Sequence, residues 1–116
     1  MKFMILMTVR DDAWNELSPV DQAQIFERHD KVSTELTNSG KLVSSHRLRP
    51  ISEARTVRRR SDGTVQVIDG PFCETKEAVG GYYLIDCASI DEALVWAERL
   101  RFMPGANEVR AVWEGE

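Results

Sequence analysis

The first clearly patterned stretch of the chain is residues 2–8, where apolar side chains occupy both faces at a spacing of two. One face carries Phe3, Ile5 and Met7, and the other carries Met4 and Leu6. A strand that is apolar on both faces is typical of a position covered on two sides. The pattern therefore predicts a strand over residues 2–8 at the centre of a sheet.

Helical spacing begins after Ser18. Ser18 can cap a helix, Pro19 suits the first helical position, and Asp21 is favourable near the positive end of the helix dipole. Gly40 supplies a left-handed residue that ends a helix, so we predict a helix to about residue 39. Its buried stripe is predicted to contain Phe26, His29, Val32 or Ser33, and Leu36.

Shorter periodic segments fill the rest of the chain. Alternation predicts a strand over residues 42–48,. Strands are predicted over residues 54–60 and 64–69, which flank Ser61-Asp62-Gly63, and over residues 80–87, where apolar groups occupy both faces,. Alternation predicts a last strand over residues 108–114,. Asp62-Gly63 suits a tight hairpin turn between the second and third of these. Ser89 and Glu92 have the spacing of a capping box that opens a second helix. The buried stripe of that helix is predicted to be Ile90, Ala93, Leu94, Ala97 and Leu100.

This order of elements predicts an α+β fold. It matches a ferredoxin-like βαβ(ββ)βαβ antiparallel sheet with two helices on one face and an inserted hairpin. The length of 116 residues and the 42% hydrophobic content fit one domain over residues 1–116,. The sheet face without helices would expose an apolar patch. We therefore expect a twofold homodimer joined by the open sheet faces, a dimeric α+β barrel.

The net charge of the chain limits the classes of partner that we expect. A net charge of −4 gives no general attraction to nucleic acid or membranes,. In extended structure Arg58 and Arg60 share a face while Arg59 points away, which makes a poor phosphate track. We expect no direct nucleic-acid binding, and an acidic partner or the sister subunit as the contact of this hairpin. Residues 1–8 are too short for a signal peptide, so a cytoplasmic protein is expected.

The cysteines and histidines give no metal or cofactor motif. Cys73 and Cys87 are separated by 13 residues, which matches neither a redox pair nor a zinc knuckle,. Reduced thiols are expected, and Cys73 would be a nucleophile only beside a cation that lowers its pKa. His29 and His46 show no ligand spacing, so no metal and no cofactor is predicted.

The segment with the densest candidate chemistry is residues 69–77, Asp69-Gly70-Pro71-Phe72-Cys73-Glu74-Thr75-Lys76-Glu77. Together with Gly80-Gly81-Tyr82-Tyr83 it resembles the signature of the DGPF-domain branch of the YCII-related proteins. The resemblance implies a dimeric α+β barrel. It also implies two kinds of function. Some family members are encoded beside extracytoplasmic-function sigma factors. Other relatives act on small chlorinated or muconolactone-like compounds with a histidine and aspartate pair. In those relatives the histidine lies eleven residues before the helix-ending glycine, as His29 does before Gly40.

Two functions from different classes remain open. The first is a small-molecule isomerase or lyase in which His29 is the base, Asp69 orients it, and Glu74 or His46 is an auxiliary acid. Its ligand would lie against Ser44, Phe72 and Tyr82. The second is a non-catalytic regulatory or ligand-binding module, an accessory of a sigma factor. The structural alternatives are a half-buried His29, a turn-forming Asp69 and a solvated Glu74.

Overall fold

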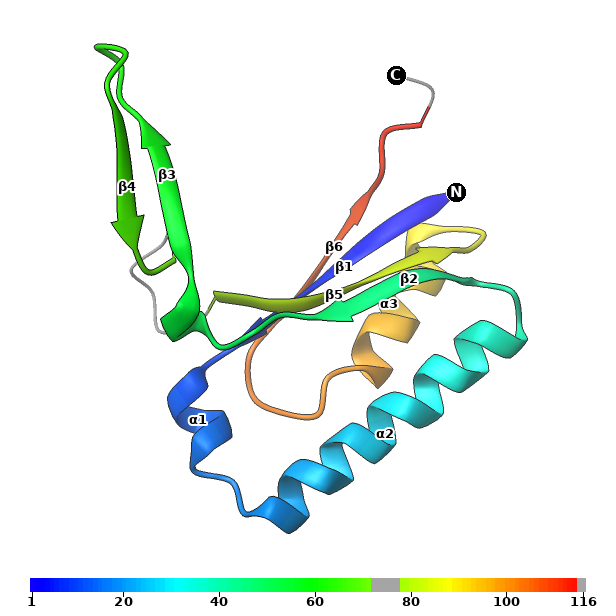
Figure 1. Cartoon of the computed structure of the whole chain (residues 1–116). Helices are drawn as coiled ribbons and strands as arrows, with labels where there is room; N and C mark the ends of the chain where they lie inside the picture. Colours follow the sequence, from blue (N-terminus) through cyan, green and yellow to red (C-terminus); the bar gives the residue numbers. More distant parts are fainter. Residues whose placement is uncertain (72–77, 115–116) are drawn as a thin grey trace.

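The computed structural model describes residues 1–71 and 78–114, which form an α+β fold around a four-stranded antiparallel sheet (Figure 1). The strand order is β2-β5-β1-β6. Their bounds are Lys2–Val9 for β1, Leu42–Arg47 for β2, Ala78–Asp86 for β5 and Asn107–Ala111 for β6. With the inserted hairpin left out, this is the order of a β-α-β-β-α-β unit. The prediction that the first strand is central is confirmed, because β1 pairs with β5 on one side and β6 on the other.

Helix α2, Pro19–Asn38, begins and ends at the predicted residues. The Ser18 side chain accepts a hydrogen bond from the Asp21 amide at 3.1 Å, which satisfies one of the free N–H groups of the first turn,. Gly40 has a φ of 73°, in the left-handed region that glycine adopts without strain,. Local sequence chemistry therefore sets both ends of this helix.

Helix α3, Ile90–Arg99, also starts at its predicted cap, where the Ser89 hydroxyl accepts from the Glu92 amide at 3.2 Å. Its buried stripe is narrower than predicted. Ala93 and Ala97 are buried, but Ile90 and Leu94 are 46% and 50% exposed. Since alanine lets the helix backbone approach the sheet closely, only the central line of the helix is covered and the flanking large side chains reach solvent.

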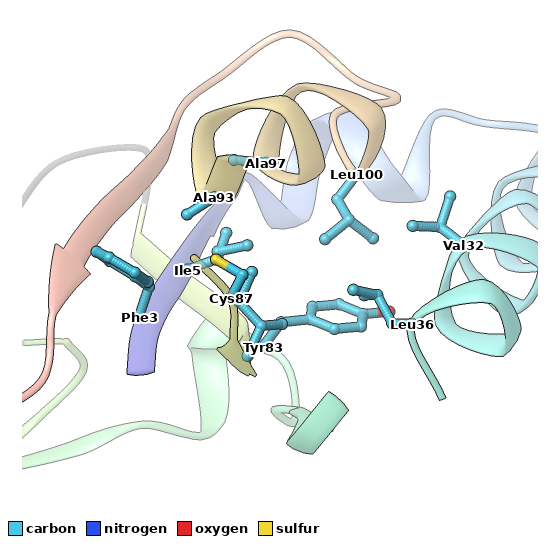
Figure 2. Packing of buried hydrophobic residues seen from close by; sticks show 10 residues of the cluster. Phe3, Ile5, Val32, Leu36, Tyr83, Cys87, Ala93, Ala97 and Leu100 are labelled. Carbon is cyan, nitrogen blue, oxygen red and sulfur yellow. The ribbon is translucent and has the colours of Figure 1, made fainter. Parts of the chain in front are cut away.

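Both long helices pack on the same face of the sheet, and the core lies between them and the central strands (Figure 2). It draws on β1, α2, β5 and α3, and on the residue that follows β5 and the residue that follows α3. Its members are Phe3, Ile5, Val32, Leu36, Tyr83, Ile85, Cys87, Ala93, Ala97 and Leu100. The predicted stripe of α2 is buried only at its C-terminal half, since Phe26 is 40% exposed. The N-terminal half of α2 therefore borders a less tightly filled part of the molecule.

Strands β3, Arg55–Arg59, and β4, Val65–Asp69, form the predicted hairpin as a separate two-stranded sheet. It projects away from the main sheet (Figure 1). Gly63 has a φ of 90° in its turn. Two short elements were not predicted: α1, Asp11–Asn15, and a 3-10 turn at Ile51–Glu53.

The last strand is shorter than predicted. β6 ends at Ala111, and Trp113 is 85% exposed rather than part of the alternating strand. The pairing register explains why β6 ends at Ala111. Ala111 pairs with Phe3, and β1 begins only one residue earlier, at Lys2, so little of β1 is left for later residues to pair with.

The sheet face opposite the helices carries a half-buried apolar group: Met4, Leu6, Tyr82 and Leu84. These side chains alternate with the core-facing residues of β1 and β5, as the pleat requires. Among the helices of the described residues, none combines the length and the apolar character that a membrane crossing needs.

Candidate functional site

A cavity of about 390 Å³ lies on the helix side of the sheet, beside the less filled half of α2. α1, α2, the adjoining strand ends and the segment that follows α3 supply its walls. The residues used below are Trp14, Phe26, His29, Arg47, Tyr83 and Phe102. A second hollow on the outer side of α2 is lined by residues of that helix alone and is an open surface. The cavity is therefore the place where side chains from several elements converge.

His29 is held in this cavity by two aromatic neighbours. Its Nδ1 lies 3.3 Å from the Tyr83 hydroxyl, and the two rings are nearly parallel with centroids 6.2 Å apart. Phe102 approaches edge to face at 4.8 Å. These contacts fix the plane of the imidazole, and an oriented ring is what proton transfer to a bound molecule requires.

The surroundings of His29 keep it neutral. Burial lowers its pKa from the ordinary value of 6.5; the nearby Asp30 carboxylate raises it, and Arg101 and Arg47 lower it further. Burial and Asp30 both raise the pKa of Tyr83. At neutral pH the pair is therefore an uncharged imidazole beside a protonated phenol. When Nδ1–H donates to the tyrosine oxygen, Nε2 is left as the proton acceptor.

Arg101 holds one wall of the cavity in place through hydrogen bonds to the backbone. Its guanidinium donates to the carbonyl oxygens of Met103, of Pro104 at 2.8 Å and of Thr8 at 3.0 Å. These bonds tie the segment after α3 to the end of β1. Phe102 is thereby held against His29 by a neighbour that is itself anchored.

The other predicted histidine, His46, lies on the opposite side of the sheet from the His29 ring. In the β2–β5 register Ser45 pairs with Tyr83 and His46 with Tyr82, and successive side chains point to opposite faces,. The His46 and Tyr82 rings contact each other, with centroids 5.8 Å apart. Both residues border the cavity from these positions, whereas Ser44 does not line it.

Ser44 instead contacts Tyr82, with the two hydroxyl oxygens 3.4 Å apart. The structure therefore brings Ser44, His46 and Tyr82 together as one group and places His29 in another. Tyr83, which sequence reasoning did not single out, is the tyrosine that meets His29. β5 is apolar on both faces, so alternation could not tell which of the two adjacent tyrosines faces the helices.

Asp69, the expected partner of His29, is the last residue of β4. Its side chain is 96% exposed, and its carboxylate lies 3.8 Å from Nε of Arg55 across the hairpin. It is not among the residues that line the cavity. The carboxylate that acts on His29 is Asp30, the next residue of α2. Phe72, Cys73 and Glu74 lie outside the described residues.

The two histidines lie on opposite sides of the sheet, His29 on α2 and His46 on β2. In residues 1–71 and 78–114 no group of three or more His, Cys, Asp or Glu side chains is placed to hold an ion. The chemistry available in the cavity comes from an imidazole, a phenol, carboxylates and arginines.

The fold and cavity define a small α+β protein in which a histidine and a tyrosine meet at a cavity on the helix side of the sheet. The sequence pattern of the YCII-related domain matches residues 1–116. An uncharacterized protein of Rhizobium meliloti (strain 1021) is 37% identical over 100 residues, covering 86% of this chain and 80% of the relative. The chain belongs to the YCII-related family.

Proposed function

We propose that this protein catalyses proton transfer on a small molecule, an isomerisation or an elimination, with His29 as the base. The observation that supports this most directly is the contact between His29 Nδ1 and the Tyr83 hydroxyl, 3.3 Å apart, at a cavity of about 390 Å³. That volume lies within the range of about 300–1,000 Å³ that is common for small-molecule sites.

The protonation states support the same chemistry. A histidine that acts as a base must be unprotonated at the working pH, and burial lowers the pKa of His29, which favours that form,. Tyr83 stays protonated because its pKa is raised. It meets the imidazole at Nδ1. In the tautomer in which Nδ1–H donates to the tyrosine oxygen, Nε2 is the atom that takes a proton from the ligand. In this proposal Tyr83 takes the orienting role that the sequence suggested for Asp69.

The test is hydrogen–deuterium exchange in D2O, followed by proton NMR, on a panel of small lactones and cyclic monoketones. We expect the wild type to catalyse exchange of acidic C–H groups. His29→Asn should lower the rate at least about 100-fold, the usual contribution of a positioned base, and His46→Asn should lower it less. Exchange by the wild type no faster than by His29→Asn across the panel would overturn the proposal.

We further propose that the protein is a homodimer joined through the sheet face that carries Met4, Leu6, Tyr82 and Leu84. Apolar groups gathered on a face without helices support this, since such patches mark interaction sites. Light scattering at micromolar concentration should give twice the chain mass of 13.2 kDa. Leu84→Lys should yield a monomer. A wild-type protein of single-chain mass would contradict the dimer.

A second candidate function, a protein-binding module, is favoured by the exposed hairpin. Val57 and Val67 face each other across it and are 69% and 65% exposed, and its arginines are exposed too. A lone two-stranded hairpin is only marginally stable by itself, so an acidic protein surface or the sister subunit is the natural contact. Replacing residues 55–69 by a Gly-Ser linker distinguishes a foreign protein partner from the sister subunit. A variant that becomes monomeric identifies the sister subunit and counts against a foreign partner.

A further inference from the structure

Arg47 is held at the mouth of the cavity in an unusual way. Its guanidinium carbon lies 5.0 Å from the centroid of the Trp14 ring and 4.7 Å from that of Phe26. The two rings meet edge to face at 5.2 Å. Three elements, α1, α2 and β2, therefore combine to fix the position of one cationic group, which we call the Arg47 clamp (Trp14, Phe26 and Arg47).

The guanidinium carbon lies over the faces of both rings, and aromatic faces attract the cationic group of an arginine. Because the two ring planes differ by 71°, the planar guanidinium cannot stack flat on both of them. The N–H groups that do not meet a ring stay available, and their fork matches the two oxygens of a carboxylate. The side chain is also exposed to solvent at the cavity mouth, so an incoming molecule can reach it.

The other arginines of the cavity already have their contacts. Arg10 pairs with Asp12 at 2.8 Å, and Arg49 pairs with Glu53 at 3.0 Å. Arg101 is bonded to backbone carbonyl oxygens. Within residues 1–71 and 78–114, by contrast, the Arg47 guanidinium makes no ion pair and no side-chain hydrogen bond.

The space around the clamp is open toward the acid/base pair. Gly81 is the β5 residue opposite Arg47, and both residues line the cavity. Tyr83 is two residues further along the same strand and so points to the same face. The charge of Arg47 is felt at His29. A molecule bound at Arg47 therefore reaches toward the imidazole.

We propose that Arg47 is the binding residue for a carboxylate of the ligand, so that the protein acts on small organic carboxylates. This inference rests on the proposed function of the same cavity. The carboxylate lies in the plane of the clamped guanidinium and turns the rest of the molecule toward His29. Asp11, which also lines the cavity, is occupied by the amides of Ile51 and Ser52 at 3.2 Å and 3.1 Å and does not compete for the guanidinium.

The test compares each carboxylate with the primary amide of the same skeleton: benzoate with benzamide, and phenylacetate with phenylacetamide. Dissociation constants are measured by NMR titration of the His29 ring signals at pH 7.5. We expect the wild type to bind each acid about tenfold or more tightly than its amide, as one charge-assisted hydrogen bond provides. Arg47→Met should remove the preference, and Arg47→Lys should keep part of it.

Arg99 provides the matched control. It too stacks on an aromatic ring, that of Trp96 at 4.9 Å, but it pairs with Glu35 and does not line the cavity. Arg99→Met should keep the wild-type preference for acids. Circular dichroism of each variant checks that the fold is retained, and Arg47→Lys keeps the test valid where Arg47→Met does not fold.

The outcomes separate this inference from the proposed function. Equal binding of acids and amides, an unchanged preference in Arg47→Met, or no carboxylate response at millimolar concentration overturns the role of Arg47. Where amides still move the His29 signals and His29-dependent exchange persists, the proton-transfer proposal stands without the carboxylate. Loss of His29-dependent exchange across the panel removes the proposed function itself.

Discussion

The contact between His29 and Tyr83 can be measured separately from any activity. Tyr83→Phe removes the hydroxyl and leaves the buried ring, and His29→Leu removes the imidazole. A typical hydrogen bond contributes a net stabilisation of about 0.5–1.5 kcal/mol. The distance of 3.3 Å is longer than the usual ~2.9 Å for such bonds,. We therefore expect a coupling energy of about 0.5–1 kcal/mol in the lower half of that range.

The assay is urea unfolding of the wild type, the two single variants and the double variant at one protein concentration. Tryptophan fluorescence reports the transition, since the chain has three tryptophans. The fixed concentration matters because the stability of a dimer depends on it. The coupling energy is the effect of the double variant minus the sum of the single effects.

Tyr82→Phe is the matched control. The Tyr82 hydroxyl makes a contact of similar length, 3.4 Å to the Ser44 hydroxyl oxygen, on the other face of the sheet. Combined with His29→Leu it should be additive. A His29–Tyr83 coupling no larger than that of this control would show that the hydroxyl does not bond to the imidazole, and the orienting role of Tyr83 would be lost.

Three further predictions follow from burial, protonation and capping. Leu36→Ala, at a fully buried site, should lower the free energy of unfolding by about 2–5 kcal/mol in urea unfolding,; Leu94→Ala, at a half-exposed site, should have a clearly smaller effect. Because the pKa of His29 is lowered on folding, the unfolded chain binds more protons just below pH 6.5,. The wild type should therefore lose stability as pH falls through this window, and a slope in His29→Gln equal to that of the wild type would contradict this. Ser18→Ala should cost about 1 kcal/mol by loss of the cap, and thermal unfolding no different from the wild type would show that the cap is dispensable.

The main elements could be predicted because their signals are local. Ser18 and Gly40 set the ends of α2 through bonds and backbone angles within a few residues of themselves. The hairpin follows from Asp62-Gly63 in the same way. The central position of β1 could also be predicted, because a strand with apolar side chains on both faces is typically covered on both sides.

α1 could not be predicted, and the reason is physical. Five residues are too few for a helical period to be recognised, since such a reading needs about 11–18 residues. The element is stabilised by distant contacts instead. The Asp11 carboxylate accepts from the amides of residues 51 and 52, and Gln22 of α2 donates to the Trp14 carbonyl oxygen at 3.0 Å. Residues 51 and 52 are about 40 residues from Asp11, and Gln22 belongs to the next helix, eight residues after Trp14.

The candidate site also depends on contacts between residues that are far apart in the sequence. His29 was found from its place on a helical stripe, a local signal. The residues that give His29 a chemical setting lie on other elements: Tyr83 on β5, Phe102 after α3, and the Arg47 clamp between α1, α2 and β2. A candidate base can be recognised in the sequence from its residue type. The residues that contact it are known only once the chain has folded and packed. For that reason the choice of Asp69 rested on the signature motif that begins with it. The structure directs attention instead to Tyr83, which lies in that signature without a role assigned to it, and to Arg47, which lies outside it.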